Sequence, residues 1–345
     1  MKIGLIGYQG SGKSTLFHWL TGQEPDPAQT HTGQSAMAEI PEPRIDQLVE
    51  IYHPKKITRA SIEIVDTPGL DRSSHEGNAQ RLAMIREADC LALVVAAFAG
   101  TDPMSELANF EEDLMLADMA ILSGRIERVE ESLKKPLPKA ERETTTHELE
   151  TLKMVFESIE AGTPIREDDL TDAQRKVTKA FRLLSEKRRL VIVNTADDEA
   201  EPERFTAQST DAVPVLAIPA QLEVDLAGME HDERAVFLEE FELECSDREE
   251  VVRMLLETSG YKVFFTAGDK EVRSWLIARG TTAVEAAGGI HTDLARGFIR
   301  AEVMTVADLV RLGSEREVKA EGLARQEPKD YVIGDDDVVL IKFNV

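Results

Sequence analysis

The chain has 345 residues, of which 42% are hydrophobic and 30% charged, and a net charge of −25 at pH 7. This composition is typical of a globular protein of two or three domains, and the strong negative charge argues against a general nucleic-acid coating protein. The apolar runs are far shorter than a membrane span, the N-terminus lacks a secretory signal, and two cysteines form no disulfide framework or metal cluster, so we expect a cytoplasmic protein that binds neither membranes nor DNA.

The N-terminal stretch predicts a phosphate-binding loop between a strand and a helix. The β-rich run KIGLIG leads into GYQGSGKS, which fits the pattern G-x-x-x-x-G-K-[ST], and KSTLFHWLTG predicts a helix that ends at a glycine. In such loops successive backbone N–H groups and the helix N-terminus converge on an anion. The residues that we expect to hold a nucleotide triphosphate are Gly10, Ser11, Gly12, Lys13, Ser14 and Thr15. Lys13 would reach the β- and γ-phosphates, and the Ser14 hydroxyl would ligate Mg²⁺.

A second strand is predicted in ASIEIVDTPGL, which ends in the motif DTPG. At the C-terminal end of this strand Asp66 would face the glycine loop and hold Mg²⁺ through water, and the Gly69 N–H can bind the γ-phosphate. The next residue, Leu70, stands where Ras-like enzymes place a water-orienting glutamine. Because leucine cannot orient water, we expect slow intrinsic hydrolysis.

A helical insertion is predicted after the third strand, DCLALVVAAF, in which Cys90 is expected to be a small core residue. Apolar residues then recur at three- and four-residue spacing across MSELANFEEDLMLADMAILSGRIERVEESLKK, which predicts one long amphipathic helix. The segment KPLP breaks it, a second helix follows to Ala161, and a third runs through DAQRKVTKAFRLLSEK. We therefore expect a helical hairpin, at residues 103–187, inserted into the sheet domain.

The fourth strand, RRLVIVNT, leads into NTAD, which is a candidate base-reading motif. Asn194 would shape a purine pocket, and Asp197 would accept hydrogen bonds from the base edge. Guanine offers two N–H donors that one carboxylate can accept together, whereas adenine presents an acceptor, so the chemistry tilts toward GTP. Thr195 replaces the lysine that GTPases usually carry and weakens this preference. After the fifth strand, AVPVLAIPA, the Ala220 N–H would face the base.

The last part of the chain predicts a separate small domain. After the helix DREEVVRMLLETSG, short β runs, turns and small helices follow from residue 261 to the end. This segment holds 12 Lys+Arg and 14 Asp+Glu and is nearly neutral, whereas residues 1–260 carry about −23. A polyanion such as ribosomal RNA would therefore approach the C-terminal part more easily.

The order of these elements predicts an α/β fold. Alternating strands and helices imply a doubly wound, mostly parallel sheet with helices on both faces, as in P-loop NTPases. We expect this domain to comprise residues 1–102 and 188–260, with the helical hairpin at 103–187 between them and a compact α+β domain at 261–345.

Nearly end to end, the sequence resembles the Obg-like ATPase family, the YchF-type branch of the translation-factor-related P-loop GTPases. The resemblance rests on PEPRIDQLVEIYHPKK, VDTPGL, MIREAD and LADMAILSGRIERVE, and in the C-terminal part on FFTAGDKEVRSW, AAGGIHTDLARGFIRAEVM and VVLIKFNV. It implies an Obg-type nucleotide domain, a coiled-coil insert and a C-terminal TGS domain with a ubiquitin-like β-grasp fold. It also implies binding and hydrolysis of ATP or GTP and association with ribosomes.

The resemblance adds one residue to the expected site and shows two departures. Thr30 precedes Arg44 by the spacing of the family's switch I threonine, so it is expected to contact Mg²⁺ or the γ-phosphate in the loaded state. Gly10 stands where the family's loop carries an asparagine, and NTAD replaces the family's usual Asn-x-x-Glu.

Two functions remain open from the sequence. The first is a slow, Mg²⁺-dependent nucleoside triphosphatase that acts as a switch, in which the loops at Thr30 and at residues 66–77 order around the nucleotide. The second is an adaptor that binds nucleotide with little or no hydrolysis, which the absent glutamine favours.

Overall fold

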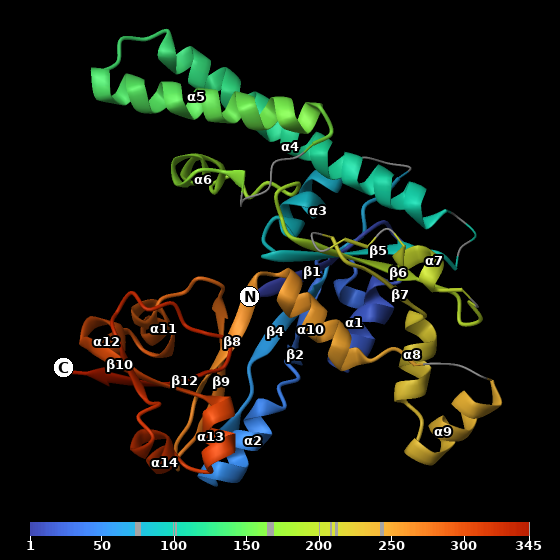
Figure 1. Ribbon diagram of the computed structural model, residues 1–345. Helices are drawn as coiled ribbons and strands as arrows, with labels where there is room; N and C mark the ends of the chain where they lie inside the picture. The colour runs from blue at the N-terminus through green and yellow to red at the C-terminus, as the bar shows by residue number, and fades with distance from the viewer. Residues whose placement is uncertain are drawn as a thin grey trace. The chain divides into compact units, whose positions relative to one another are not determined.

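The computed structural model describes residues 1–72, 77–98, 100, 102–163, 169–199, 201–207, 209–210, 213–241 and 245–344. The chain divides into two units (Figure 1). The first contains residues 1–36 and 63–246, and the second contains residues 37–62 and 247–345. In the ranges described, no helix combines the length and the apolarity needed to cross a membrane.

The first unit is built on a six-stranded sheet with the order β2-β4-β1-β5-β6-β7. Its strands are β1 (Lys2–Ile6), β2 (Gln34–Glu39), β4 (Ser61–Asp66), β5 (Cys90–Ala96), β6 (Arg189–Asn194) and β7 (Val215–Ile218). The neighbours β4–β1, β1–β5, β5–β6 and β6–β7 are parallel. All residues of β5 and β6 are buried, Cys90 among them, as expected for strands covered on both faces. The predicted doubly wound fold is confirmed.

Strand β2 is an addition to the predicted sheet. Its sequence, QSAMAE, contains few strand-forming residues, and only Gln34 and Ala38 are buried. The strand therefore forms because it hydrogen-bonds to the edge of the sheet, and the local sequence pattern does not predict it.

The first unit also contains helices outside the insert. They are α1 (Lys13–Thr21), α3 (Asn78–Ile85), α7 (Glu203–Thr206), α8 (Ala220–Ala227) and α9 (His231–Glu240), with a short 3₁₀ turn at Pro27–Gln29. The five predicted strands are present in the expected order, as β1, β4, β5, β6 and β7, and α1 follows β1 after the glycine loop.

The predicted helical hairpin is present (Figure 1). It consists of α4 (Pro103–Leu133) and α5 (Lys139–Glu160), followed by the short α6 (Asp172–Thr178). Phe110 and Leu114, near the start of α4, pack into the core of the sheet domain. Further along, the two long helices and the returning chain share a second apolar cluster: Leu122, Val129, Leu152, Val155, Ile159, Leu170 and Leu183.

The third helix of the insert is shorter than predicted, because a distant carboxylate binds its expected last turns. Helix α6 ends at Thr178, although the helical pattern continues to Lys187. Asp118 of α4 accepts hydrogen bonds from the backbone N–H of Leu184, at 3.1 Å, and of Ser185, at 2.8 Å. These donors are therefore satisfied outside a helix.

The second unit is built on a sheet with the order β11-β10-β12-β8-β9-β3. Its strands are β3 (Ile57–Thr58), β8 (Tyr261–Thr266), β9 (Val272–Ala278), β10 (Phe298–Thr305), β11 (Arg325–Glu327) and β12 (Asp337–Phe343). Its helices are α2 (Arg44–Tyr52), α10 (Arg248–Thr258), α11 (Ala283–Ile290), α12 (Thr292–Arg296), α13 (Val306–Leu312) and α14 (Glu315–Ala320). The last strand, β12, lies in the middle, parallel to β8 and antiparallel to β10, and α11 supplies Ala283 and Ala286 to the core. This is the expected β-grasp arrangement.

Residues 37–62 join the second unit, although we expected them in the nucleotide domain. Strand β3 pairs in parallel with β9, and the Ala60 N–H donates to Ser274 Oγ at 2.8 Å. The Thr58 hydroxyl donates to Glu271 Oε1 at 2.6 Å. The physical reason is that a two-residue strand has no stability alone and forms on an existing sheet edge.

Candidate functional site

The loop between β1 and α1 has the conformation that a phosphate cradle requires. Gly12 caps α1 with a φ of 94°, and Gly10 has a φ of 79°. A Cβ on Gly12 would lie 2.0 Å from Asn194 Nδ2, whereas a Cβ on Gly10 would meet nothing within 4 Å. Gly12 is therefore required by both its backbone angle and its neighbour, and the first N–H groups of α1 remain accessible to an anion.

Asn194 connects the glycine loop to the end of the sheet. Its Nδ2 donates to the Ser11 carbonyl at 3.1 Å, and its Oδ1 accepts from the Ala220 N–H at 3.1 Å. Both Asn194 and Thr195 are buried. The asparagine of NTAD thus holds the loop in place. The Ala220 N–H, which we expected to face the base, instead donates to the Asn194 side chain.

Lys13 is a buried cation within the loop. Its Nζ donates to the Tyr8 carbonyl at 2.7 Å and lies 3.4 Å from the Gly7 carbonyl, and the residue is only 6% exposed. Burial lowers the pKa of Lys13 to about 8, although the carboxylates of Asp66 and Glu106 act in the opposite direction. A phosphate that enters the loop would replace these carbonyls as the partner of the ammonium.

Nucleotide affinity should fall as the pH rises through about 8, because the free protein loses the Lys13 proton there. A bound polyanion favours the charged ammonium, so the complex keeps this proton to higher pH. Above pH 8 the complex therefore holds more protons than the free protein, and raising the pH favours dissociation. Between about pH 7 and pH 9 we expect the dissociation constant to rise by about tenfold.

Calorimetric titrations in buffers of different ionisation heat would measure this proton uptake directly. A terminal phosphate, with a second pKa of about 6, carries no such proton above pH 8, so uptake there reports on the protein. We expect about half a proton per nucleotide at pH 8. Binding without proton uptake at that pH would contradict the assignment to Lys13.

Ser14 and Asp66 form the candidate metal site. The Ser14 hydroxyl donates to Asp66 Oδ2 at 2.7 Å, and Gln34 Nε2 lies 3.3 Å from the same oxygen. The other oxygen, Asp66 Oδ1, is buried without a hydrogen-bond partner. Mg²⁺ prefers oxygen ligands and usually combines one or two protein groups with phosphate oxygens and water, so this pair fits the ion. Among the residues described, no group of three or more His, Cys, Asp or Glu side chains could hold a metal alone.

The DTPG segment lies directly on the glycine loop. The Leu70 N–H donates to the Gly7 carbonyl at 3.1 Å, and the Leu70 carbonyl accepts from the Gln9 N–H at 3.0 Å. A Cβ on Gly69 would lie 2.8 Å from Lys13 Nζ. The Gly69 backbone and the Lys13 ammonium are therefore close together, as γ-phosphate binding by both would require.

Thr30 is not brought together with these groups. It is exposed, its hydroxyl donates to the Pro27 carbonyl at 2.8 Å, and it does not belong to the described lining of the cavity. Its contact with Mg²⁺ or phosphate in a loaded state stays a prediction.

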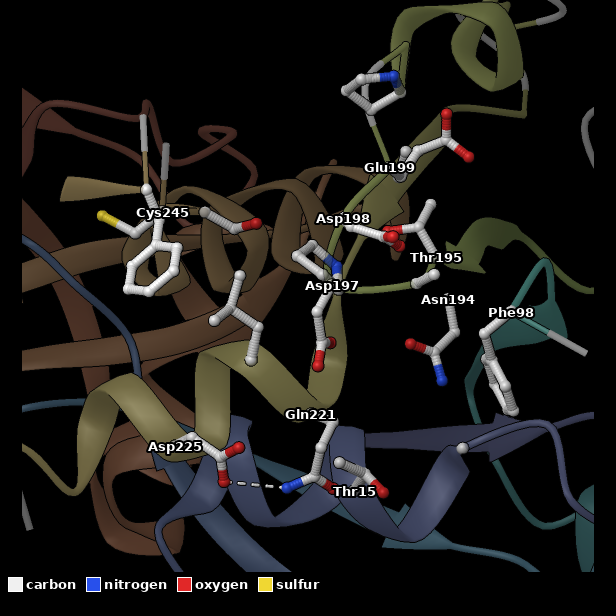
Figure 2. Close-up of a pocket in the computed structure, with 18 of the residues that line it drawn as sticks. Thr15, Phe98, Asn194, Thr195, Asp197, Asp198, Glu199, Gln221, Asp225 and Cys245 are labelled. Atoms are coloured by element: carbon white, nitrogen blue, oxygen red, sulfur yellow. Dashed lines mark hydrogen bonds between the residues drawn. The ribbon is translucent and has the colours of Figure 1, made fainter. Parts of the chain in front are cut away.

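A cavity of about 1800 Å³ opens beside the loop and extends along the ends of β6 and β7. Figure 2 shows Asn194 and Asp197 in it, with Phe98 and Gln221 near them. Asp197 is exposed. The lining contains five carboxylates from the chain after β6 and from α8: Asp197, Asp198, Glu199, Glu203 and Asp225. Of the described residues that line the cavity, Lys13 is the only Lys or Arg, so positive charge is confined to the loop end.

Sequence reasoning missed a polar cluster that connects the loop to α4. The Tyr8 hydroxyl donates to Asp113 Oδ2 at 2.8 Å, and its ring meets Phe110 edge-on at 5.1 Å. The Arg72 guanidinium lies 4.1 Å from the centre of the Tyr8 ring and pairs with the buried Glu106 at 2.7 Å. Burial and the Asp113 hydrogen bond raise the pKa of Tyr8, which stays a neutral donor. The sequence signal that could have indicated this cluster is the i, i+4 and i, i+3 spacing of Glu106, Phe110 and Asp113, which places the three residues on one face of α4.

Comparisons with known proteins cover the whole chain. Residues 2–123 match the family model described as a 50S ribosome-binding GTPase, and residues 261–344 match the model of the C-terminal part of YchF GTPases, described as a protein of unknown function (DUF933). The chain is 32% identical to the ribosome-binding ATPase YchF of Bacillus subtilis over all of both chains. It is 34% identical to Obg-like ATPase 1 of Oryza sativa subsp. japonica, over all of this chain and 92% of the relative.

Solved structures support the fold. The YchF GTPase of Schizosaccharomyces pombe aligns with a TM-score of 0.84 and 24% identity over 99% of this chain and 97% of that chain. A GTP-binding protein of Pyrococcus horikoshii aligns over all of both chains with a TM-score of 0.61 and 18% identity.

Proposed function

This chain belongs to the YchF-type, Obg-like ATPase family, and from this premise we propose that it is a P-loop nucleoside triphosphatase that acts as a nucleotide-dependent switch on the ribosome. The observation that carries the proposal is the contact of Ser14 with Asp66 beside the buried Lys13. These three residues come from the glycine loop and from the end of a neighbouring strand, and together they provide a cation, a hydroxyl and a carboxylate for a Mg²⁺-bound triphosphate.

Hydrolysis at this site would depend mainly on positioning. The loop N–H groups and Lys13 would bind the phosphates, and the Gly69 N–H would donate to a γ-phosphate oxygen. Ser14 and Asp66 would hold Mg²⁺, which when bound neutralises part of the phosphate charge. We propose that Thr30 moves to this site in the loaded state, and that its loop acts together with the segment 66–77, of which residues 73–76 lie outside the described part of the chain.

We propose that the site accepts both GTP and ATP. Asp197 lies at the cavity and can accept from the two N–H donors of guanine, which favours GTP. Thr195 is buried and offers no long aliphatic stem to cover the base, which reduces that preference. The relatives named above are described as ATPases, which supports use of ATP as well.

The proposed partner is the ribosome. The GTPase family model and the Bacillus subtilis relative are both described as ribosome-binding. We propose that ribosomal RNA contacts the nearly neutral C-terminal domain, which we propose to be a TGS domain, or the helical insert at 103–187. Such a partner places the protein in the cytoplasm.

One observation favours the adaptor as a second candidate. Leu70, at the position of the water-orienting glutamine, is 1% exposed and packs into the core with Ile6, Ile85 and Phe110. This side chain can neither reach nor orient an attacking water.

Single-turnover phosphate release, compared with the affinity for fluorescent GTP and ATP analogues, separates the two functions. The triphosphatase should release phosphate slowly alone and faster with ribosomes present, because a large partner orders the loops around the nucleotide. Tight binding without any phosphate release, in both conditions, would establish the adaptor instead.

A further inference from the structure

The position that normally orients water is occupied by a residue that is fixed in the core. Leu70 lies in the apolar cluster described above, and its N–H and carbonyl are bound to Gly7 and Gln9 of the glycine loop. The Leu70 side chain has no polar atom, and its backbone N–H and carbonyl already have hydrogen-bond partners, so this residue offers no group that could orient a water at a γ-phosphate. If this protein hydrolyses nucleotide, another side chain must position the water.

Gln9 is a polar residue of the glycine loop whose backbone lies against the DTPG segment. A Cβ on Gly69 would lie 2.7 Å from Gln9 N, 2.9 Å from Gln9 Cα and 2.8 Å from Lys13 Nζ. The backbone of Gln9 thus lies beside the two groups that would bind the γ-phosphate. Gln9 is exposed, and its carboxamide makes no hydrogen bond within the part of the chain that the structure describes.

Hydrogen bonds hold the backbone at Gln9 in place, so the position from which its side chain starts is fixed. The Gln9 N–H donates to the Leu70 carbonyl at 3.0 Å, and the neighbouring Tyr8 is anchored to Asp113 of α4. A glutamine carboxamide reaches about 4–5 Å from its Cα, through four bonds of about 1.2–1.5 Å each. That length would allow the carboxamide to reach a water on the outer side of a phosphate held by Lys13 and Gly69.

We propose that the Gln9 carboxamide orients the attacking water in place of the residue at Leu70. This inference rests on the proposed triphosphatase function. The Gln9 carbonyl oxygen would accept a hydrogen bond from the water, and its amide would donate to a γ-phosphate oxygen. As the water oxygen bonds to the γ-phosphorus, the bond to the β–γ bridging oxygen breaks. The bridging oxygen leaves with the electron pair on the nucleoside diphosphate, and the water proton passes to the released phosphate.

Single-turnover phosphate release from Gln9→Ala, with protein in saturating excess, tests the proposal. We expect the rate to fall at least tenfold while the dissociation constant stays within about threefold, because the loop N–H groups and Lys13 would supply most of the phosphate binding, whereas the carboxamide would position the water. The matched control is Gln47→Ala, which removes an exposed glutamine from α2 of the second unit and should keep the wild-type rate.

Gln9→Glu provides a readout that a purely structural role would not change. The carboxylate keeps the length of the side chain but repels the γ-phosphate, so the rate should be low at neutral pH and rise as the pH falls and the carboxyl gains its proton. The wild-type rate should lack this acid-side rise.

Three results would overturn the proposal, and they are distinguishable. A wild-type rate in Gln9→Ala shows that the water is oriented by another group, with the triphosphatase function intact. Weakened binding with an unchanged saturated rate assigns Gln9 to loop structure. If wild-type protein itself binds nucleotide but releases no phosphate with ribosomes, the triphosphatase function fails and Gln9 has no reaction to assist.

Discussion

Lys13→Ala should abolish measurable nucleotide binding and phosphate release. In the free protein the ammonium is buried and bonded to the Tyr8 carbonyl at 2.7 Å, so it is already positioned within the loop that would receive the phosphates. Removing one partner of a buried charge pair costs about 3–5 kcal/mol, which corresponds to an affinity weaker by about 10²-fold to several thousandfold. The loss should be at least as large in phosphate release, because charge on the γ-phosphate also develops against this group.

Fluorescent-nucleotide titration and phosphate release should be measured on the same preparation. The matched control is Lys139→Ala, which removes a lysine with a 92% exposed side chain from the helical hairpin and should leave both quantities unchanged. Thermal unfolding of the two variants without nucleotide checks that each is folded. Wild-type binding and turnover in Lys13→Ala would exclude the glycine loop as the phosphate site.

Asp118→Ala should destabilise the first unit by about 3–5 kcal/mol, because it leaves a buried arginine without its counter-charge. Asp118 is fully buried and pairs with Arg86 at 2.6 Å. It also accepts from the backbone N–H of Leu184 and Ser185 and from the Ser185 hydroxyl. Alanine would leave each of these donors unpaired in an apolar environment.

Urea unfolding followed by tryptophan fluorescence can isolate this effect. The chain has two tryptophans, Trp19 in α1 of the first unit and Trp275 in β9 of the second. In a Trp275→Phe background the signal reports on the first unit, and the shift in midpoint gives the change in free energy of unfolding.

Two further variants make the Asp118 measurement specific. Asp118→Asn keeps an acceptor but removes the negative charge, so its loss should be intermediate. Glu150→Ala, at an exposed position of α5, should change the free energy by less than about 0.5 kcal/mol. If Asp118→Ala falls within the same range as Glu150→Ala, the buried pair contributes nothing to stability.

The parts of the fold that local pattern determines were predictable. The glycine loop, the two long helices of the insert and the buried strands each depend on residues within one short stretch, such as the alternation before Asp66 or the three-and-four spacing before Leu133. The β-grasp domain was predictable only through the family resemblance, because its β runs alone do not specify which strand lies in the middle.

The missed features all depend on contacts between distant segments. The end of α6 is set by Asp118, more than fifty residues earlier, and β3 forms only against β9. At the site, Tyr8 and Glu106 are joined through Arg72, which no motif contains. Sequence pattern reports the chemistry of single residues but not these pairings. The roles of Thr30 and Asp197 depend on a bound nucleotide and remain predictions.

The hydrogen bond of Tyr8 with Asp113 and the ion pair of Arg72 with Glu106 connect the first turns of α4 to the glycine loop and to the segment after DTPG. The 31 residues of α4 extend about 46 Å at 1.5 Å per residue. A tilt of about 5° at the loop end would move the opposite end by about 4 Å, given that length. Helix length alone would thus make a small change in the direction of α4 at the glycine loop into a displacement as large as a side chain at the hairpin tip.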